Sequence, residues 1–216
     1  EFSPGPGHAS VDMNSRVLHL SLLGLVALAM AISAYQPFDR ATWYLEVGPV
    51  LIAAPVLWFT YDRFRLTDIV YILIAIHALI LITGGHYTYA RVPVGFWVQD
   101  ALDLARNHYD RLGHVAQGFI PAMITRELLL RKTPLQRGGW LFLLVTCVAL
   151  AISAFYELIE WWVALYMGGE ADEFLATQGD IWDTQWDMFL ALCGAILAQL
   201  SLSRLHDRQL AALNAN

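Results

Sequence analysis

The chain has 216 residues, of which 57% are hydrophobic and 15% charged, and its formal net charge is -6 at pH 7. Soluble domains have about 45–50% apolar and about 25% charged residues. The composition therefore excludes an ordinary soluble domain and predicts an integral membrane protein, and the length leaves little room for a second domain.

Residues 1–12 are rich in proline and glycine, lack helical periodicity and end before Met13. We interpret them as the remnant of an expression tag. We expect one transmembrane helical domain over residues 13–206, followed by a short cytoplasmic tail over residues 207–216.

Six apolar segments follow in chain order: 17–35, about 43–61, 68–83, 112–130, 140 to about 164, and 184–202. A helix that crosses a membrane needs about 20 residues. Segment 112–130 is the weakest because it contains Gln117, Pro121 and Arg126, and it either crosses or forms a half-buried or re-entrant helix. We predict an all-α, polytopic membrane bundle of about six transmembrane helices.

Basic residues lie mostly on one side of this predicted bundle. Nine of the 13 Lys and Arg residues fall on the side of the termini: Arg16, Arg63, Arg65, Arg126, Arg131, Lys132, Arg137, Arg204 and Arg208. The positive-inside rule then places both termini in the cytoplasm. The loops around residues 84–114 and 167–183 face outward together.

The first of these outward loops carries histidines and a polar stripe. The stripe is spaced i, i+4, i+7, i+11 and i+14 and enters segment 112–130: Asp103, Asn107, Asp110, His114 and Gln117. His108 lies beside it, and His86 follows the third apolar segment. His19, His77 and His206 we interpret as packed, structural or surface residues.

Carboxylates gather at the outward ends of the fifth and sixth segments. Glu157 and Glu160 are spaced i, i+3, while Asp180, Asp183 and Asp187 lie on one helical face. Three further acids, Glu170, Asp172 and Glu173, lie in the loop between these segments. We interpret Asp180 as a helix cap as readily as a ligand, and we expect Asp187 to matter more because it lies deeper.

Several like charges at one mouth of a bundle repel, so they are either protonated or neutralised by a cation. Histidine with carboxylate is a ligand set for zinc, and carboxylate-rich sites favour iron or manganese. We predict a divalent-metal site with these ligands: His86, His114, Glu157, Glu160, Asp183 and Asp187. Asp110 and His108 follow as ligands or as residues that orient them.

Four stretches carry a family resemblance: GGHYTYARVP, RNHYDRLGHVAQGFIPA, YELIEWW and GDIWDTQWDM. Together they resemble the uncharacterised bacterial inner-membrane family typified by YjdF of Escherichia coli. The resemblance covers nearly the whole chain after residue 12. It implies a multi-pass inner-membrane protein and no particular activity.

Three functions remain open. One is a metal-dependent hydrolase in which Glu157 or Asp110 acts as general base and Arg106 or Arg111 holds an anionic headgroup. The second is a cation or proton transporter or channel, and the third is a protein whose polar cluster is purely structural. As partners we expect the lipid bilayer and a lipid-like substrate, and no nucleic acid.

Overall fold

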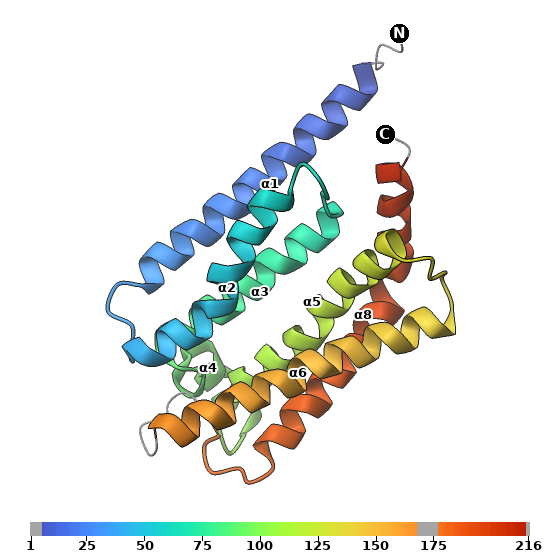
Figure 1. Cartoon of the computed structure of the whole chain (residues 1–216). Helices are drawn as coiled ribbons and strands as arrows, with labels where there is room; N and C mark the ends of the chain where they lie inside the picture. The colour runs from blue at the N-terminus through green and yellow to red at the C-terminus, as the bar shows by residue number, and fades with distance from the viewer. Residues whose placement is uncertain (1–5, 168–176, 215–216) are drawn as a thin grey trace.

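The computed structural model describes residues 6–167 and 177–214 of the chain (Figure 1). Within these ranges the chain forms seven α-helices and one short 3-10 helix, which confirms the all-α prediction. The elements are α1 (Pro6–Ser33), α2 (Arg40–Thr60), α3 (Asp68–Tyr87), η1 (Tyr89–Arg91), α4 (Pro93–Leu102), α5 (Tyr109–Lys132), α6 (Gly139–Met167) and α8 (Asp183–Asn214).

Five stretches are long and apolar enough to cross a membrane: Met13–Ser33, Arg40–Thr60, Asp68–Tyr87, Gly139–Tyr166 and Asp183–Leu213. The predicted sixth, in α5, does not meet this criterion. Its 24 residues would nevertheless extend about 36 Å at about 1.5 Å per residue. Helix α5 is thus long enough to cross the bilayer but too polar to be recognised by hydropathy.

The polarity of α5 follows from its position in the bundle. It packs against α8, α6 and α3, and twelve of its 24 residues are buried. Because neighbouring helices cover so much of its surface, α5 needs fewer apolar side chains than a helix that faces lipid. Five of its polar residues are buried in the protein interior, where they can form sites: Asp110, His114, Thr125, Arg126 and Glu127.

Small residues bring α5 and α8 into close contact. A Cβ atom on Gly118 would collide with the backbone carbonyl of Ala191, and one on Gly194 would collide with that of Val115. Such small residues let helix backbones approach closely inside a membrane. This contact sets the first turns of α5 and α8 side by side.

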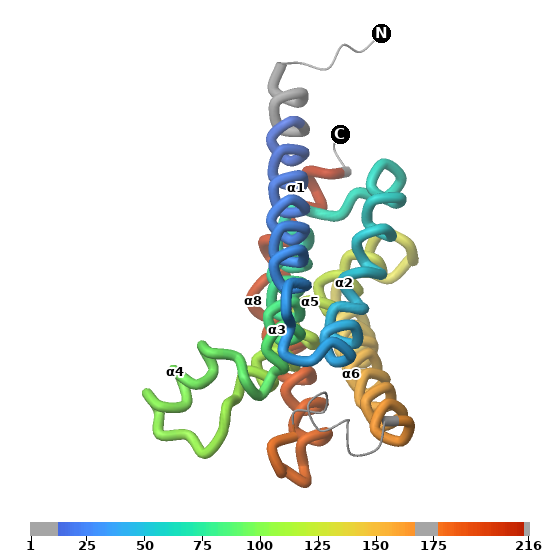
Figure 2. The backbone as a smooth tube through the Cα atoms, turned by 90° about the vertical axis from the view of Figure 1, so that its left-hand side faces the viewer, coloured from blue at the N-terminus to red at the C-terminus, as the bar shows by residue number. Residues whose placement is uncertain are grey.

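Helix α1 begins and α8 ends at the same end of the bundle (Figure 1). We call this the terminal end; it also holds Thr67 and Lys132. The opposite, distal end holds the C-terminus of α3 and the N-termini of α5 and α8. Figure 2 shows α4 projecting sideways from the bundle near the distal end. Phe96 and Trp97 are exposed on α4, as expected of a helix that lies at a membrane interface.

Candidate metal centre

Five titratable side chains from three helices meet at the distal end. Asp110 and His114 lie on one face of the first turns of α5, Glu157 and Glu160 on the last turns of α6, and Asp187 on the second turn of α8. We call these five residues the distal cluster. Their helical spacings of three or four residues align each pair on one face, and the close α5–α8 contact brings the helices together.

The Nε2 edge of His114 faces two aspartates. Nε2 lies 3.4 Å from Asp110 Oδ1 and 3.7 Å from Asp187 Oδ1. One donor atom from each of these three residues lies within 4.8 Å of the other two. Three potential ligand atoms from two helices therefore surround one point.

The Nδ1 edge of the same ring faces a second group of acids. Nδ1 lies 3.1 Å from Gln117 Oε1 and 3.9 Å from Glu157 Oε1. His114, Glu157 and Glu160 form a second set whose donor atoms lie within 4.8 Å of one another. His114 thus lies between two acidic groups and is shared by both.

The distal cluster is buried and short of hydrogen bonds. Asp187 is 2% exposed, His114 6% and Glu157 7%. Asp187 Oδ1 and Glu157 Oε1 have no hydrogen-bond partner among the described residues. Buried polar atoms are normally paired, and an unpaired buried carboxylate is costly. These two oxygens are therefore the strongest sign that a further positive group belongs there.

Arg106 and Arg111 pair with aspartates that precede or begin α8. Arg106 Nη2 lies 2.8 Å from Asp183 Oδ1, and its Nη1 donates to the carbonyl of Thr177. Arg111 Nη2 lies 3.1 Å from Asp180 Oδ2. The two predicted substrate-binding arginines therefore hold the start of α8, and the predicted ligand Asp183 is engaged by Arg106. Glu170, Asp172 and Glu173 lie outside the described residues.

Two predicted histidine ligands, His86 and His108, are not part of either set of close donor atoms at His114. His86 Nδ1 is 2.9 Å from the carbonyl oxygen of Ser33, near the α1–α2 connection. His108 directly precedes α5, and its buried Nδ1 has no hydrogen-bond partner among the described residues. Burial, reinforced by Arg111 and Arg106, lowers the pKa of His108 below its ordinary value. His108 is therefore neutral at pH 7 and borders the cluster.

The polar stripe predicted over residues 103–117 is only partly helical, which corrects that prediction. Asp103 ends α4 with a left-handed backbone (φ 50°), and α5 begins only at Tyr109. Asn107 Oδ1 accepts from the backbone N–H of Tyr109 at 3.0 Å, and its Nδ2 donates to the carbonyl of Val92. Asn107 thus fixes the entry to α5, and the stripe is real only from Asp110 onward.

Glu46 on α2 is a buried acid that the sequence analysis missed. It is 3% exposed, accepts a hydrogen bond from Tyr156 at 3.2 Å and from Tyr89, and interacts electrostatically with Asp110 and His114. Burial raises the pKa of Tyr89 well above its ordinary value, so this hydroxyl remains a donor. A lone carboxylate inside the apolar run YLEVGP was the available signal.

A second buried polar group lies at the terminal end. We call Arg126, Glu127, Arg131, His206 and Asp207 the terminal network. Glu127 and His206 are both fully buried. Glu127 accepts from Arg131 at 2.6 Å, from the Thr67 hydroxyl at 2.7 Å and lies 3.0 Å from His206 Nε2. Arg126 contacts both His206 Nδ1 and Asp207 Oδ1 at 2.8 Å, so each acid of the network faces an arginine, although Asp207 Oδ1 accepts no hydrogen bond of good geometry.

The fold and the two polar groups define a polytopic all-α membrane protein with a buried, acid-rich distal cluster and a paired terminal network. The chain belongs to the family described as "Predicted membrane protein (DUF2238)", which matches residues 18–208. It is 54% identical over 188 residues to the "Inner membrane protein YjdF" of Escherichia coli (strain K12), a match that covers 87% of this chain and 88% of that protein.

No solved structure matches the chain. The comparisons confirm the resemblance predicted from the four motifs and make the chain a multi-pass protein of the inner membrane. Neither the family description nor the name of the Escherichia coli relative states an activity.

Proposed function

We propose that the distal cluster binds a divalent metal ion and that the protein uses this ion to hydrolyse a lipid-like substrate at the membrane surface. The observation that carries the proposal is the unpaired state of Asp187 Oδ1 and Glu157 Oε1, two buried oxygens directed at His114. Four acids surround this single histidine, so the cluster needs an additional positive charge.

The spacing of the donor atoms fits ligands that share one ion. Metal–ligand bonds of about 2.0–2.2 Å place neighbouring ligand atoms about 2.8–3.1 Å apart in octahedral and about 3.3–3.6 Å apart in tetrahedral geometry. His114 Nε2 lies 3.4 Å from Asp110 and 3.7 Å from Asp187, which is too long for good hydrogen bonds. Small side-chain movements would bring all three onto one ion.

Gln117 supports this assignment because it orients the ring. A proton on His114 Nδ1 would donate to Gln117 Oε1 at 3.1 Å, which leaves the Nε2 lone pair directed at Asp110 and Asp187. Metal-binding histidines are usually fixed in this way by a partner on the other nitrogen. With one histidine and several carboxylates, the set favours manganese or iron, with zinc as the alternative.

Hydrolysis is the simplest chemistry for such a site. The metal would activate a water molecule, and Glu157, whose Oε1 remains without a hydrogen bond, would serve as general base. Glu160 extends the acidic group and would hold a second ion if the centre were dinuclear. Arg106 and Arg111 lie on the outer side of this site, where an anionic headgroup would compete with Asp183 and Asp180 for them.

Cation transport is the alternative, and the packing of α5 argues against it. The polar face of this helix ends at Gln117 and resumes at Thr125. Between them Ile120, Ala122 and Met123 are each at most 3% exposed and lie within the packed interior. A conduction path needs polar groups along its whole length, so a metal-dependent reaction at the distal end is favoured.

We also propose that the terminal end faces the cytoplasm, so the distal cluster faces the periplasm. Support comes from Arg131, Lys132 and Arg137, which lie together at the terminal end with the helix termini, as the positive-inside rule expects. This orientation would give the proposed hydrolase access to substrates on the periplasmic side.

Metal content tests the first part of the proposal. Protein purified in detergent without added chelator should contain manganese, iron or zinc near one equivalent by elemental analysis, and H114A should contain less than a tenth of it. The control D180N changes an acid that pairs with arginine outside the cluster, and it should keep its metal. Wild-type protein that stays metal-free after incubation with each of these ions would refute metal binding.

Hydrolysis tests the second part. Wild-type protein in nanodiscs should cleave ester or phosphoester lipids in a panel, with activity lost on chelation and restored by the metal. E157Q should retain the metal but lose at least a hundredfold in rate, as expected for a general base. Metal-loaded protein without activity on any lipid of the panel would refute the hydrolase and leave the metal site standing.

A further inference from the structure

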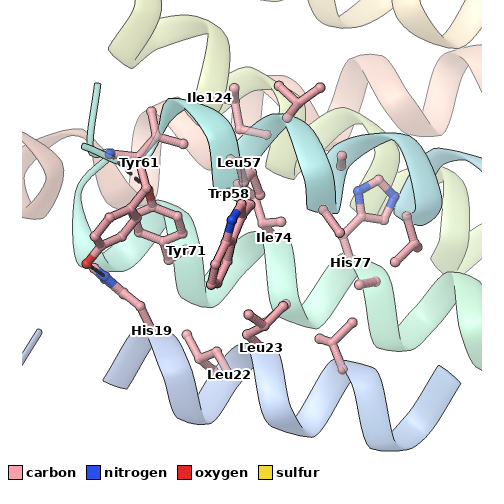
Figure 3. Close-up of a pocket in the computed structure, with 18 of the residues that line it drawn as sticks. His19, Leu22, Leu23, Leu57, Trp58, Tyr61, Tyr71, Ile74, His77 and Ile124 are labelled. Carbon is pink, nitrogen blue, oxygen red and sulfur yellow. Dashed lines mark hydrogen bonds between the residues drawn. The ribbon is translucent and has the colours of Figure 1, made fainter. Parts of the chain in front are cut away.

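A groove of about 660 Å³ opens between α1 and α2 (Figure 3), and no residue of the distal cluster lines it. Both helices pack on α3, which forms the floor. Leu23 lines one wall, Leu57 and Trp58 line the other, and Ile74 and Ile124 lie between them. Its volume is in the range of small-molecule sites, about 300–1,000 Å³.

The length of the groove matches the thickness of one leaflet of a bilayer. On α1 it extends from Arg16 to Val26, and on α3 from Tyr71 to Leu81. Ten residues of helix correspond to about 15 Å at about 1.5 Å per residue. The hydrocarbon core of a bilayer is about 30 Å thick, so the groove spans one leaflet within the membrane-crossing helices.

Polar groups gather at the terminal end of the groove. His19 Nδ1 lies 2.8 Å from the Tyr61 hydroxyl, and its Nε2 lies 3.0 Å from Asp68 Oδ1, so Asp68 is already engaged. Arg16 and Asp62 line the same end. Beyond this end the lining is aliphatic or aromatic apart from His77.

The rim of this polar end is basic. Arg63 directly follows the lining residue Asp62, and Arg65 comes two residues later, while Arg131 and Lys132 lie over the ring of Phe64 between them. Of these basic residues Arg16 lines the groove itself, Arg63, Arg65 and Lys132 lie at the same end of the bundle, and Arg131 is paired with Glu127. Such a rim attracts an anionic headgroup, while the lining beyond it suits a hydrocarbon chain.

We propose that this groove binds one acyl chain of an anionic phospholipid from the leaflet at the terminal end. The acyl chain lies between α1 and α2 on α3, and the phosphate of the lipid headgroup lies at the rim beside Arg16. This site is separate from the distal cluster and does not depend on a metal ion or on the proposed hydrolysis.

Lipid retention measured by native mass spectrometry tests the proposal. Protein with bound lipid removed is incubated in detergent with equal amounts of phosphatidylglycerol and phosphatidylcholine of the same chain length. Wild-type protein should retain one phosphatidylglycerol, at least fivefold over phosphatidylcholine. A53W and A54F each place a large ring in the groove and should each lower retention at least fivefold.

Two further variants separate chain binding from headgroup binding. R16Q should lose the preference for phosphatidylglycerol while still retaining a phospholipid. The control A151W adds the same ring to an exposed position on α6 and should behave as wild type. Equal retention by wild type, A53W and A54F, each eluting as a monodisperse species, would overturn the proposal. Retention should be unchanged by chelation, so its outcome is independent of the metal experiments.

Discussion

The two buried polar groups of this protein use the same central helices, α5 and α8, but they are balanced in opposite ways. In the terminal network, Glu127 and Asp207 are matched by Arg131 and Arg126 at 2.6 and 2.8 Å, and Arg137, outside the network, lies 3.0 Å from Asp207. In the distal cluster, four acids surround only His114, at 3.4–3.9 Å for the three measured pairs. Among the described residues, both acids of the terminal network lie within 3.0 Å of an arginine, whereas none of the four acids of the distal cluster forms an ion pair with one.

The comparison shows that burial of charge alone does not indicate a functional site. Glu127 is fully buried, but its oxygens accept from Arg131 and Thr67, so its role is accounted for by stability. Asp187 is similarly buried, but its Oδ1 accepts no hydrogen bond from any described residue. This difference in pairing is the reason we propose the distal cluster, and not the terminal network, as the cation site.

Breaking the terminal network should lower the free energy of unfolding more than any of the changes that follow. E127Q removes the charge that Arg131 and His206 face, which leaves buried donors and a cation without their partner. Removing one member of a buried ion pair costs about 3–5 kcal/mol. The free energy of unfolding, measured by SDS titration in mixed micelles, should fall by this amount. D100N, an exposed acid on α4, serves as control and should change it little.

Removal of the metal should have the next largest effect on stability. This effect should require an intact distal cluster. A ligand at 100 times its Kd stabilises a folded protein by about 2.7 kcal/mol. Chelation should therefore lower the thermal midpoint of wild-type protein by several degrees, and it should leave that of H114A unchanged. An equal response of the two proteins to chelator would contradict a stabilising ion at His114.

In chelator-treated protein, neutralising one aspartate in each region should change the free energy of unfolding by small amounts of opposite sign. D187N replaces a buried, unpaired carboxylate by a neutral amide, so the free energy of unfolding should stay constant or rise by about 1 kcal/mol. D207N breaks partly exposed ion pairs to Arg126 and Arg137 and should lower it by about 1 kcal/mol. Destabilisation of both variants would show that the acids of the distal cluster are already satisfied.

Hydropathy and length predict the lipid-facing part of this fold but not its centre. The apolar segments that correspond to α1, α2, α3, α6 and α8 extend at most two residues beyond the observed helices, although α1 begins 11 residues before its segment and α8 ends 12 residues after its own. Segment 112–130 is the weak one because α5 is covered by other helices. Hydropathy measures exposure to lipid, and it therefore underestimates the helix around which the bundle is built.

Helical spacing predicts neighbours on one helix but not across the bundle. It correctly pairs Asp110 with His114, but it extends the stripe to Asp103 although the backbone turns there. The contact between Glu46 and Tyr156 joins residues 110 positions apart. Such a contact depends on the packing of α2 near α6, for which the sequence of either helix alone carries no signal.

The affinity of two matched variants for metal tests directly whether the distal cluster binds an ion. Asp187 and Asp207 lie on α8, one in each polar group, and D187N and D207N make the same chemical change. Equilibrium dialysis of chelator-stripped proteins against manganese should give at least a tenfold weaker Kd for D187N than for wild type. D207N should stay within twofold of wild type. Equal affinity of the two variants, or no saturable binding to wild type with manganese, iron or zinc, would contradict the account.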